Sequence, residues 1–410
     1  MEASSLHHVH EALGARLGEV AGREVPRHYG DPAGEYAAAR NHAAVVDRAD
    51  RALVRLFGRD PLRMIQGLVS NDVAGAPEGQ GVYAAMLTPK GKMIADLRVL
   101  RRPQGDVLLE LDAGALPGVL EHLRKYVPPL FARFEDVTGA LGVVGVYGPA
   151  ARQAVGAALG AELPEDMTED AFVAVAGPRA GGAGDAAAGG ASGAGRGHGD
   201  GEAGEPRGSA AAASGGAGSG GADRGLLVLR TLYAGVDGYD VVVPRDRLGA
   251  VWRALVEAGA RPAGHGTLEV LRIEAGRPRW GAELDETVIP LEAGLGDRAI
   301  SQTKGCYTGQ EVIVRILHRG HVNWHLRGLL LGEAPALARG TVLVRAGEAK
   351  PVGRVTSACA SPAQGQTIGL GYVRREVEPP AELRLGGPDG APARVVALPF
   401  PEPERKDRAV

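Results

Sequence analysis

The chain has 410 residues, a formal net charge of −3 and two cysteines. This length allows two or three domains with a sizeable core, and the balanced charge gives no reason to expect a nucleic-acid partner. The two cysteines, Cys306 and Cys359, are too few for a disulfide framework, which favours a reducing compartment. The sequence leaves open whether a single disulfide bond joins them. The first residues lack the features of a secretory signal, and no run of about 18 apolar residues occurs, so we expect a cytoplasmic protein without a membrane span.

Strand-like and helix-like segments alternate through the first part of the chain. Asp60 and Pro61 predict the start of a helix, with Asp60 as its N-cap, and the apolar residues that follow lie on one helical side. Further along, period-two runs and turn residues predict strands, and one apolar stripe predicts another helix. These elements are strands at 52–57, 82–87, 93–100, 107–111 and 141–147, and a helix at 116–127.

Residues 177–224 differ from the rest, because they are mostly Gly, Ala and Ser without a large apolar side chain. Such a segment cannot bury enough surface to offset its ordering entropy, so we predict a disordered insertion. The alternative is a segment that folds on a partner. Beyond it we predict strands at 226–232 and 239–243 and helices at 248–258 and 267–274.

After Trp324 the pattern changes to short runs separated by Gly and Pro. These runs, at 326–331, 342–345, 352–357, 367–373 and 393–398, indicate a small all-β barrel or sandwich. The fold class is therefore α+β, with mixed sheets and helices followed by a small all-β barrel or sandwich. We expect a first domain at 1–320, interrupted by the insertion at 177–224, a barrel at 321–400 and a disordered tail at 401–410.

The segment KGCYTGQE, residues 304–311, carries the main chemical signal. Thr308 and Glu311 have the spacing of a capping box, so we predict a helix from Gly309 with Cys306 on a glycine-flanked turn just before it. Lys304 is a nearby cation, and a cation and a helix N-terminus both favour the thiolate. The alternative is an inert cysteine at a well-capped helix entry.

A single cysteine cannot complete a metal site, because structural zinc and iron–sulfur sites usually take about four protein ligands. If Cys306 binds a cluster, a partner, a second copy of the chain or a small molecule must supply the other ligands. A thiol nucleophile would need a histidine base, and His318 and His321 are candidates only by their proximity in sequence. We interpret Cys359 as a core residue.

KGCYTGQE resembles the signature of the YgfZ family, whose members include proteins that assist iron–sulfur cluster assembly. Other segments resemble, in the same order, the aminomethyltransferase of glycine cleavage. They are RHYGDPAGEYAAARNHAAVVD at 27–47, LVSNDV at 68–73, YAAMLTPKGKMIADL at 83–97, YAGVDGYDVVVP at 233–244 and LRIEAGRPRWGAELDETVIPLEAG at 271–294. The resemblance covers nearly everything except the insertion. It implies a tetrahydrofolate-binding domain around a central opening and a small C-terminal β-barrel.

The resemblance also implies roles for particular residues. Asp96 matches a carboxylate that contacts the reacting nitrogen region of the folate, and Asp240 matches the acidic residue that recognises the pterin. A carboxylate suits this task because it accepts two hydrogen bonds from neighbouring N–H groups. Tyr239 could form an aromatic wall, and Arg272 could hydrogen-bond the ligand.

Further candidates for the folate site are Trp280, Lys304 and Tyr307. Each candidate has an ordinary structural alternative. Asp240 could cap a strand edge, Asp96 could be solvated, Tyr239 and Trp280 could fill the core, and Arg272 could belong to a structural ion pair.

Two departures from the aminomethyltransferase pattern decide between functions. This chain has the Cys306 segment where the aminomethyltransferase carries a phenylalanine-isoleucine-glycine type sequence, and it reads Ala95-Asp96 where the aminomethyltransferase has paired acidic residues. The leading hypothesis is therefore a tetrahydrofolate-binding accessory protein for iron–sulfur cluster assembly or repair, which supports clients such as tRNA-modifying enzymes. Cys306 would be a shared, transient cluster ligand or a redox-active thiol. The alternatives are a true aminomethyltransferase and a folate-binding regulatory module with a structural Cys306.

Overall fold

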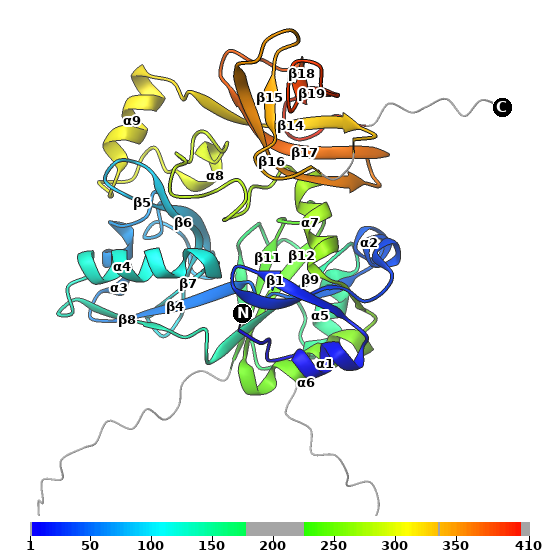
Figure 1. The fold of residues 1–410 in the computed structure, drawn as a ribbon. Coiled ribbons are helices and arrows are strands. Elements are labelled where there is room, and N and C mark those ends of the chain that lie inside the picture. The colour runs from blue at the N-terminus through cyan, green and yellow to red at the C-terminus, as the bar shows by residue number, and fades with distance from the viewer. Residues whose placement is uncertain (1, 178–224, 335–336, 403–410) are drawn as a thin grey trace, which may run out of the picture.

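The computed structural model describes residues 2–177, 225–334 and 337–402. The predicted insertion and tail fall largely on residues outside these ranges. Among the described residues the chain forms two β-sheets that pack face to face, helices on their outer faces, and a β-barrel (Figure 1). This is the α+β architecture with a closed C-terminal barrel that the sequence predicts.

The first sheet has the strand order β5-β6-β7-β4-β8 and is antiparallel throughout. Its strands are β4 (Arg51–Gly58), β5 (Val82–Leu87), β6 (Met93–Arg101), β7 (Val107–Asp112) and β8 (Ala132–Asp136). Helices α3 (Pro61–Gln66) and α4 (Leu116–Tyr126) cover one face, and a short 3-10 helix, η1 (Ala113–Ala115), precedes α4. Asp60 caps α3 as predicted, since its side chain accepts a hydrogen bond from the Arg63 N–H group.

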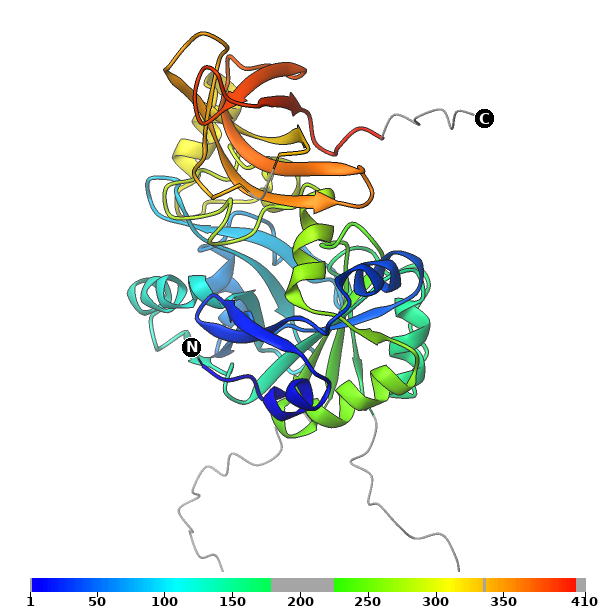
Figure 2. The same cartoon turned by 45° about the vertical axis from the view of Figure 1, so that its right-hand side comes forward.

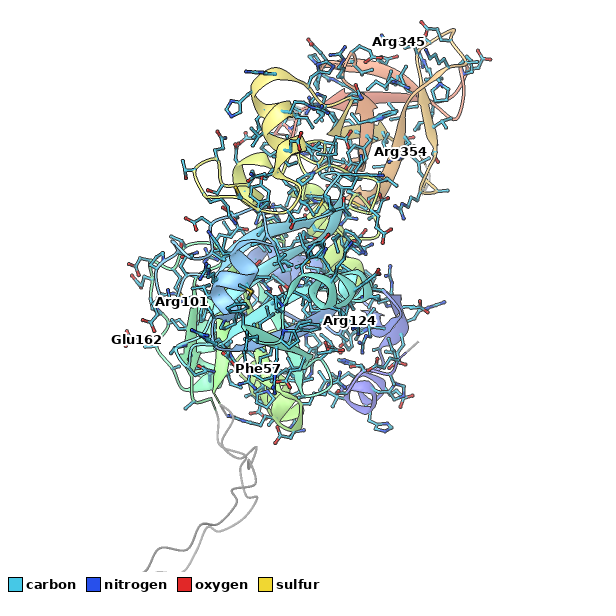
Figure 3. All side chains as sticks on the ribbon, turned by 90° about the vertical axis from the view of Figure 1, so that its left-hand side faces the viewer. Phe57, Arg101, Arg124, Glu162, Arg345 and Arg354 are labelled. Carbon is cyan, nitrogen blue, oxygen red and sulfur yellow. The ribbon has the colours of Figure 1, made fainter. Side chains whose placement is uncertain are left out.

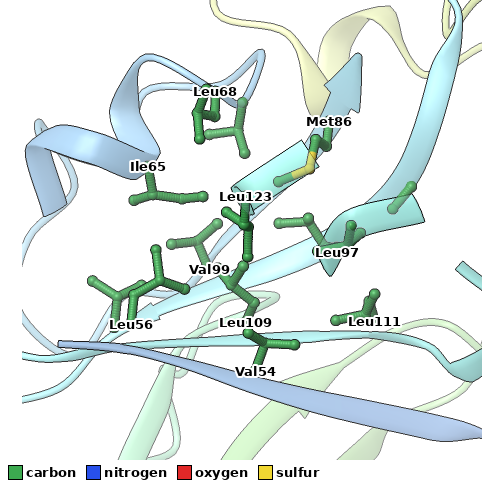
Figure 4. Close-up of a cluster of buried hydrophobic side chains, with 14 of the residues drawn as sticks. Val54, Leu56, Ile65, Leu68, Met86, Leu97, Val99, Leu109, Leu111 and Leu123 are labelled. Carbon is green, nitrogen blue, oxygen red and sulfur yellow. The ribbon is translucent and has the colours of Figure 1, made fainter. Parts of the chain in front are cut away.

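Strand alternation explains why this sheet has one apolar face. Val54, Leu97, Val99 and Leu109 point to the helix side and are almost completely buried there, against helix residues such as Leu123 (Figure 4). Their neighbours in sequence point to the other side, toward the second sheet. The alternating runs of the sequence therefore set both the strands and the face that each side chain occupies.

The second sheet has the order β10-β11-β12-β9-β3-β13, and β13 is its parallel member. Its strands are β3 (Ala44–Asp47), β9 (Leu141–Tyr147), β10 (Phe172–Val175), β11 (Leu226–Thr231), β12 (Gly238–Pro244) and β13 (Arg261–Pro262). The associated helices are α2 (Pro32–Asn41), α5 (Ala151–Leu159), α6 (Arg245–Glu257) and α7 (His265–Glu274). The N-terminal helix α1 (His7–Ala12) and a separate hairpin of β1 (Arg16–Val20) and β2 (Arg23–His28) lie beside this sheet (Figure 2).

The barrel closes in the order β14-β17-β16-β15-β18-β19. Its strands are β14 (Trp324–Gly332), β15 (Val342–Val344), β16 (Pro351–Ser361), β17 (Gln366–Arg374), β18 (Ala381–Leu385) and β19 (Pro392–Val396). Figure 3 shows Arg345 and Arg354 in this part of the molecule, well away from Phe57 and Arg124 of the lower body. A long segment with the short helix α8 (Gly296–Ala299) and helix α9 (Gln310–Arg319) connects the barrel to the sheets.

The predicted capping box does not form. Helix α9 begins at Gln310, and its N-cap is Gly309, which has a φ of 85° and no side chain that could cap. The Gln310 side chain instead accepts a hydrogen bond from the Tyr307 N–H group at 3.1 Å. A Cβ atom at Gly309 would lie 2.5 Å from the carbonyl oxygen of Thr88, so both the backbone conformation and the close packing require glycine here.

Candidate functional site

The two sheets meet through an apolar layer at one end and a charged layer at the other. Leu53, Leu100 and Leu108 of the first sheet pack against residues such as Leu229 and Val242 of the second. Two and four residues further along the strands, the same faces carry charged side chains instead. They are Arg51, Asp96, Arg98, Glu110 and Asp112 on the first sheet, and Asp240 on the second.

A pocket of about 540 Å³, part of it open to solvent, lies at this charged layer. Its lining includes Asp96, Asp170 and Asp240 together with the aromatic residues Tyr83 and Tyr233. The residues that line it are more polar than is usual for small-molecule sites. A ligand that fits here must therefore offer many hydrogen-bonding groups as well as a planar or apolar part for the tyrosine rings.

Asp240 lines the pocket and belongs to a buried hydrogen-bond network. Its Oδ1 accepts a hydrogen bond from the Tyr147 hydroxyl at 2.8 Å, and its Oδ2 accepts one from Arg98 Nη2 at 2.6 Å. Arg48 donates to the Tyr147 hydroxyl at 2.6 Å and lies 3.6 Å from Asp240 Oδ1. Each carboxylate oxygen retains a second lone pair, so Asp240 can still accept from a ligand.

Glu110 neutralises the two arginines that flank it. Arg98 Nε donates to Glu110 at 2.8 Å, and Arg51 pairs with both of its oxygens. Burial alone would raise the pKa of Glu110, but Arg51 and Arg98 hold it well below its usual range. These two cations form their hydrogen bonds with Glu110 and Asp240, and their charges also oppose the effect of burial on the pKa values of Asp96, Asp112 and Asp170.

Asp96 keeps one oxygen without a protein donor. The Tyr83 hydroxyl donates to its Oδ2 at 3.0 Å, while its Oδ1 is shielded from solvent and has no hydrogen-bond partner among the described residues. Burial raises the pKa of this carboxyl group. Buried polar atoms are rarely left unpaired in native proteins, so the free oxygen is available to a hydrogen-bond donor, either a water molecule or a ligand group.

Asp170 is a second pocket carboxylate without a committed cation. It has a φ of 68°, which turns the chain sharply before β10, and its side chain lines the pocket. Burial raises its pKa to about 6, with Arg98 and Arg298 opposing that rise. No sequence pattern pointed to Asp170, because its position depends on an irregular turn.

Tyr83 is held in place from above by Arg298, whose guanidinium lies 4.4 Å from the centre of the tyrosine ring. Arg298 also donates to Glu169 at 2.8 Å. The aromatic wall of the pocket therefore comes from Tyr83 and Tyr233, which the sequence did not single out. Each is the first residue of a segment that it did single out, 83–97 and 233–244 respectively.

Several predicted folate residues lie away from this pocket. Tyr239 points to the opposite face of β12 from Asp240 and is 3% exposed in the core beside α5 and α6. Arg272 is fully buried, where it donates to Glu283 at 2.7 Å and to the Ser357 hydroxyl at 2.6 Å. It thereby links α7 to the barrel, which is the structural alternative considered for it.

Trp280 packs between the helix face of the first sheet and the connecting segment, and it does not line the pocket. Tyr307 is 8% exposed and packs in the same region as Leu87 and Ile313. The structure thus brings Asp96 and Asp240 together and leaves the other candidates elsewhere.

The Cys306 segment forms a loop on the surface. Cys306 is exposed, and both cysteines are free thiols. Among the residues that the structure describes, no hydrogen bond joins Cys306 to His318 or His321, although these histidines are also exposed. Cys359 lies within β16, where burial raises its pKa to about 12, in agreement with a core role.

Lys304 does not act as a cation beside the thiol. Its Nζ donates to the carbonyl oxygens of Gln66, Val69 and Asn71 at 2.7, 2.7 and 2.8 Å. Three acceptors match the three donors of an ammonium group, so Lys304 fastens the loop to the end of α3. The expectation that it activates Cys306 is not supported by this geometry.

Comparisons with known proteins agree with this architecture. The profile of the GCVT N-terminal domain matches residues 6–181 and 220–304, and that of the glycine cleavage T-protein C-terminal barrel domain matches 325–401. The aminomethyltransferase of Rubrobacter xylanophilus is 32% identical over 99% of this chain and 96% of its own length. That of Corynebacterium jeikeium is 30% identical over 98% of both chains.

A crystal structure of the glycine cleavage system aminomethyltransferase T from Bartonella henselae has the same fold. It superposes with a TM-score of 0.79 over 98% of both chains at 20% sequence identity. No helix in the described part of the chain is long and apolar enough to cross a membrane. The matches to both domain profiles show that this chain belongs to the family defined by the GCVT N-terminal domain and the glycine cleavage T-protein C-terminal barrel domain.

Proposed function

We propose that this protein binds a reduced folate in the pocket between the two sheets and acts as a folate-dependent aminomethyltransferase, as in glycine cleavage. The relatives at 32% and 30% identity carry the name aminomethyltransferase, and they match this chain along nearly its whole length. This support favours transfer over the iron–sulfur hypothesis that the Cys306 segment suggested. Bound tetrahydrofolate would supply secondary amines that take up a one-carbon unit.

The observation that carries the proposal is the unpaired Oδ1 of Asp96 in a pocket lined by further carboxylates. A reduced pterin presents a row of N–H donors, and carboxylates are the acceptors that such donors require. We assign Asp96 to the reacting end of the ligand and Asp240 to the pterin, as the resemblance implies. Tyr83 orients Asp96 through its hydroxyl group, and Arg98 and Tyr147 hold Asp240.

The first test is binding. Tetrahydrofolate should bind the purified protein, and Asp96→Asn should weaken binding at least about tenfold, because it loses a charged hydrogen bond worth about 1.5–3 kcal/mol. The control is Asp389→Asn, which changes an exposed barrel aspartate outside the pocket. Unchanged tetrahydrofolate affinity in Asp96→Asn would contradict the assignment of Asp96 to the reacting end of the ligand.

The second test is catalysis. An aminomethyltransferase releases ammonia from an aminomethylated lipoyl carrier when tetrahydrofolate is present. We expect this release with the wild-type protein, a strong loss in Asp96→Asn, and no loss in Cys306→Ala. Folate binding without any ammonia release would favour the second candidate below.

That second candidate is a YgfZ-type accessory protein for iron–sulfur cluster assembly or repair. The observation that favours it is the exposed thiol of Cys306, on a loop that Lys304 and Gln310 hold in place. A partner could reach this thiol and share a transient cluster through it. A folate-binding regulatory module, with Cys306 as a structural residue, is the remaining alternative.

Replacement of Cys306 by Ala in the native host separates these candidates. The accessory role predicts lower activity of an iron–sulfur tRNA-modifying enzyme under oxidative stress. Full activity would contradict a maturation role of the thiol and leave the transferase or the regulatory module. Wild-type chain expressed from the same site is the matched control.

We also propose that the chain divides into a folate-binding domain at 1–320 and a barrel at 321–400. In support of this division, β14 begins at Trp324 and the two family profiles meet between residues 304 and 325. The two free thiols fit a cytoplasmic protein, which we propose as its location.

A further inference from the structure

A cluster of metal-binding side chains lies on the N-terminal helix, apart from the pocket between the sheets. Helix α1, at the bottom of Figure 1, carries His7, His8 and Glu11, and none of them lines that pocket. Residues three and four positions apart are neighbours on a helix, so both imidazole rings can reach the Glu11 carboxylate. One donor atom from each side chain lies within 4.8 Å of the other two, and no second group of this kind occurs in the described part of the chain.

The spacing of these atoms matches that of ligands around a single metal ion. His7 Nε2 lies 3.3 Å from Glu11 Oε1, and His8 Nδ1 lies 3.5 Å from Glu11 Oε2. Zinc binds imidazole nitrogen and carboxylate oxygen at about 2.0–2.2 Å in a tetrahedral arrangement, which places neighbouring ligand atoms roughly 3.3–3.6 Å apart. The cluster can therefore close on such an ion through small movements of its side chains.

A buried carboxylate orients His7 for this role. The Glu24 side chain, on β2, is 8% exposed, and its Oε1 lies 2.7 Å from His7 Nδ1. Because a carboxylate can only accept, this contact places the proton of the neutral ring on Nδ1 and leaves the lone pair of Nε2, on the side of Glu11, for a metal. Histidines that bind metals usually donate their other ring N–H group to a carboxylate, a carbonyl or water, and Glu24 provides such an acceptor.

The charges around the cluster also favour a cation. Glu11 and Glu24 bring two negative charges to the two imidazole rings, while Arg23, next to Glu24 in the sequence, forms an ion pair with Glu2. Protonation of the rings is the competing way to balance these charges, and the hydrogen bond to Glu24 raises the pKa of His7. A divalent ion supplies two positive charges and also binds both ring nitrogens, so it uses the whole cluster.

We propose that His7, His8 and Glu11 bind one Zn²⁺ ion, with water in the fourth position, and that Glu24 acts as a positioning residue for His7. Imidazole and carboxylate groups are ordinary zinc ligands, and three protein ligands leave one position open. Helix α1 has six residues and no side-chain cap, and helices this short are marginal by themselves. An ion that joins its first and last turns stabilises it. This site is separate from the folate pocket and does not depend on the proposed function.

The first experiment is a zinc titration of the full chain by calorimetry, after a chelator has removed bound metal ions. The wild type should bind one equivalent of Zn²⁺. The His8 side chain is 95% exposed, so His8→Ala should keep the fold while it removes one ligand. We expect its zinc affinity to fall at least about tenfold, since loss of a group that merely orients a ligand already costs about 10–100-fold.

His318→Ala is the matched control, because it removes an exposed histidine on α9 outside the cluster. Its zinc affinity should equal that of the wild type. Failure of the wild type to bind zinc, or equal affinity in His8→Ala, would overturn the proposal. Loss of the ion in Cys306→Ala but not in His8→Ala would overturn it as well, because the ion would then lie at the Cys306 loop.

The second experiment locates the ion. Nitrogen-15 NMR of the histidine rings, with assignments from His7→Gln and His8→Ala, should show zinc-dependent shifts of His7 Nε2 and His8 Nδ1, while His7 Nδ1 keeps its proton. Hydrogen exchange adds a backbone readout at Leu13, whose N–H group donates to the Val9 carbonyl at 3.1 Å. Zinc should slow this exchange in the wild type and leave it unchanged in His8→Ala. Zinc-dependent shifts confined to other histidines would contradict the site.

Discussion

The pocket and the Cys306 loop differ in how their polar groups are held. At the pocket, Asp240 and the adjacent Glu110 are buried, and both accept short hydrogen bonds from Arg98. In the loop, the group that could be reactive, the Cys306 thiol, is exposed and forms no disulfide bond. The charged group nearest to it in the motif, Lys304, is occupied with backbone carbonyls.

This difference indicates that the pocket suits recognition of a small molecule and the loop suits contact with a partner. A buried network keeps its members in one geometry and shifts their pKa values, which suits recognition of a small molecule inside the protein. In the described part of the chain, no hydrogen bond or ion pair joins a base or a cation to the exposed thiol, so we expect any reaction there to use a group from a partner. Removal of single residues from each region should make this contrast measurable.

The largest effect is expected for Asp240→Ala. This change leaves Arg98 without one of its two carboxylates and Tyr147 without its acceptor, and breaking a buried ion pair typically destabilises by about 3–5 kcal/mol. Chemical denaturation should show this loss, together with loss of tetrahydrofolate binding. A stability within about 1 kcal/mol of the wild type would mean that the network is not what fixes the pocket.

The next effect concerns Asp112 and depends on pH. Its pKa is raised from 3.8 to about 6, so the folded state holds the proton more tightly than the unfolded state. Stability is therefore lost as pH rises from about 4 to 6, by about 3 kcal/mol once ionisation is complete.

In Asp112→Asn this loss should disappear. The unfolding free energy of the variant relative to that of the wild type should therefore be higher at pH 8 than at pH 4. Urea unfolding at both pH values measures this difference. Asp389→Asn provides the control. It changes an exposed residue, so this variant should show the same pH dependence of stability as the wild type. An equal pH slope in wild type and Asp112→Asn would contradict the buried, protonated Asp112.

An intermediate effect is expected for Lys304→Met. The methionine keeps much of the chain length but removes three hydrogen bonds to carbonyl groups near the end of α3. We expect a loss of about 2 kcal/mol in unfolding free energy. Hydrogen exchange should report faster opening at Thr308, whose N–H group donates to the Gly67 carbonyl at 3.1 Å.

The smallest effect is expected for Cys306→Ala. The thiol is exposed and makes no described contact that the fold needs, so unfolding free energy should change by less than about 0.5 kcal/mol. Tetrahydrofolate affinity should stay within about twofold of the wild type. A large loss of stability or affinity would show that the loop and the pocket are coupled, and the contrast between the two regions would fail.

The sequence by itself determined much of the local structure. The strands β5 and β9 lie where the period-two runs predicted them, and Asp60 with Pro61 begins α3 as expected. These signals are local, since strand alternation and helix caps depend on neighbouring residues. Asp96 and Asp240 were also named in advance, through the resemblance of the motifs that contain them.

Only the tertiary structure decided which polar residues meet. Arg272 and Lys304 looked like site residues, but their partners, Glu283 and the carbonyls after α3, are set by packing between distant segments. Asp112 and Asp170 gave no local signal, because Asp112 becomes a neighbour of Asp96 only through the register of β6 and β7. Alternation tells which face a residue occupies, whereas register and sheet packing determine what it faces.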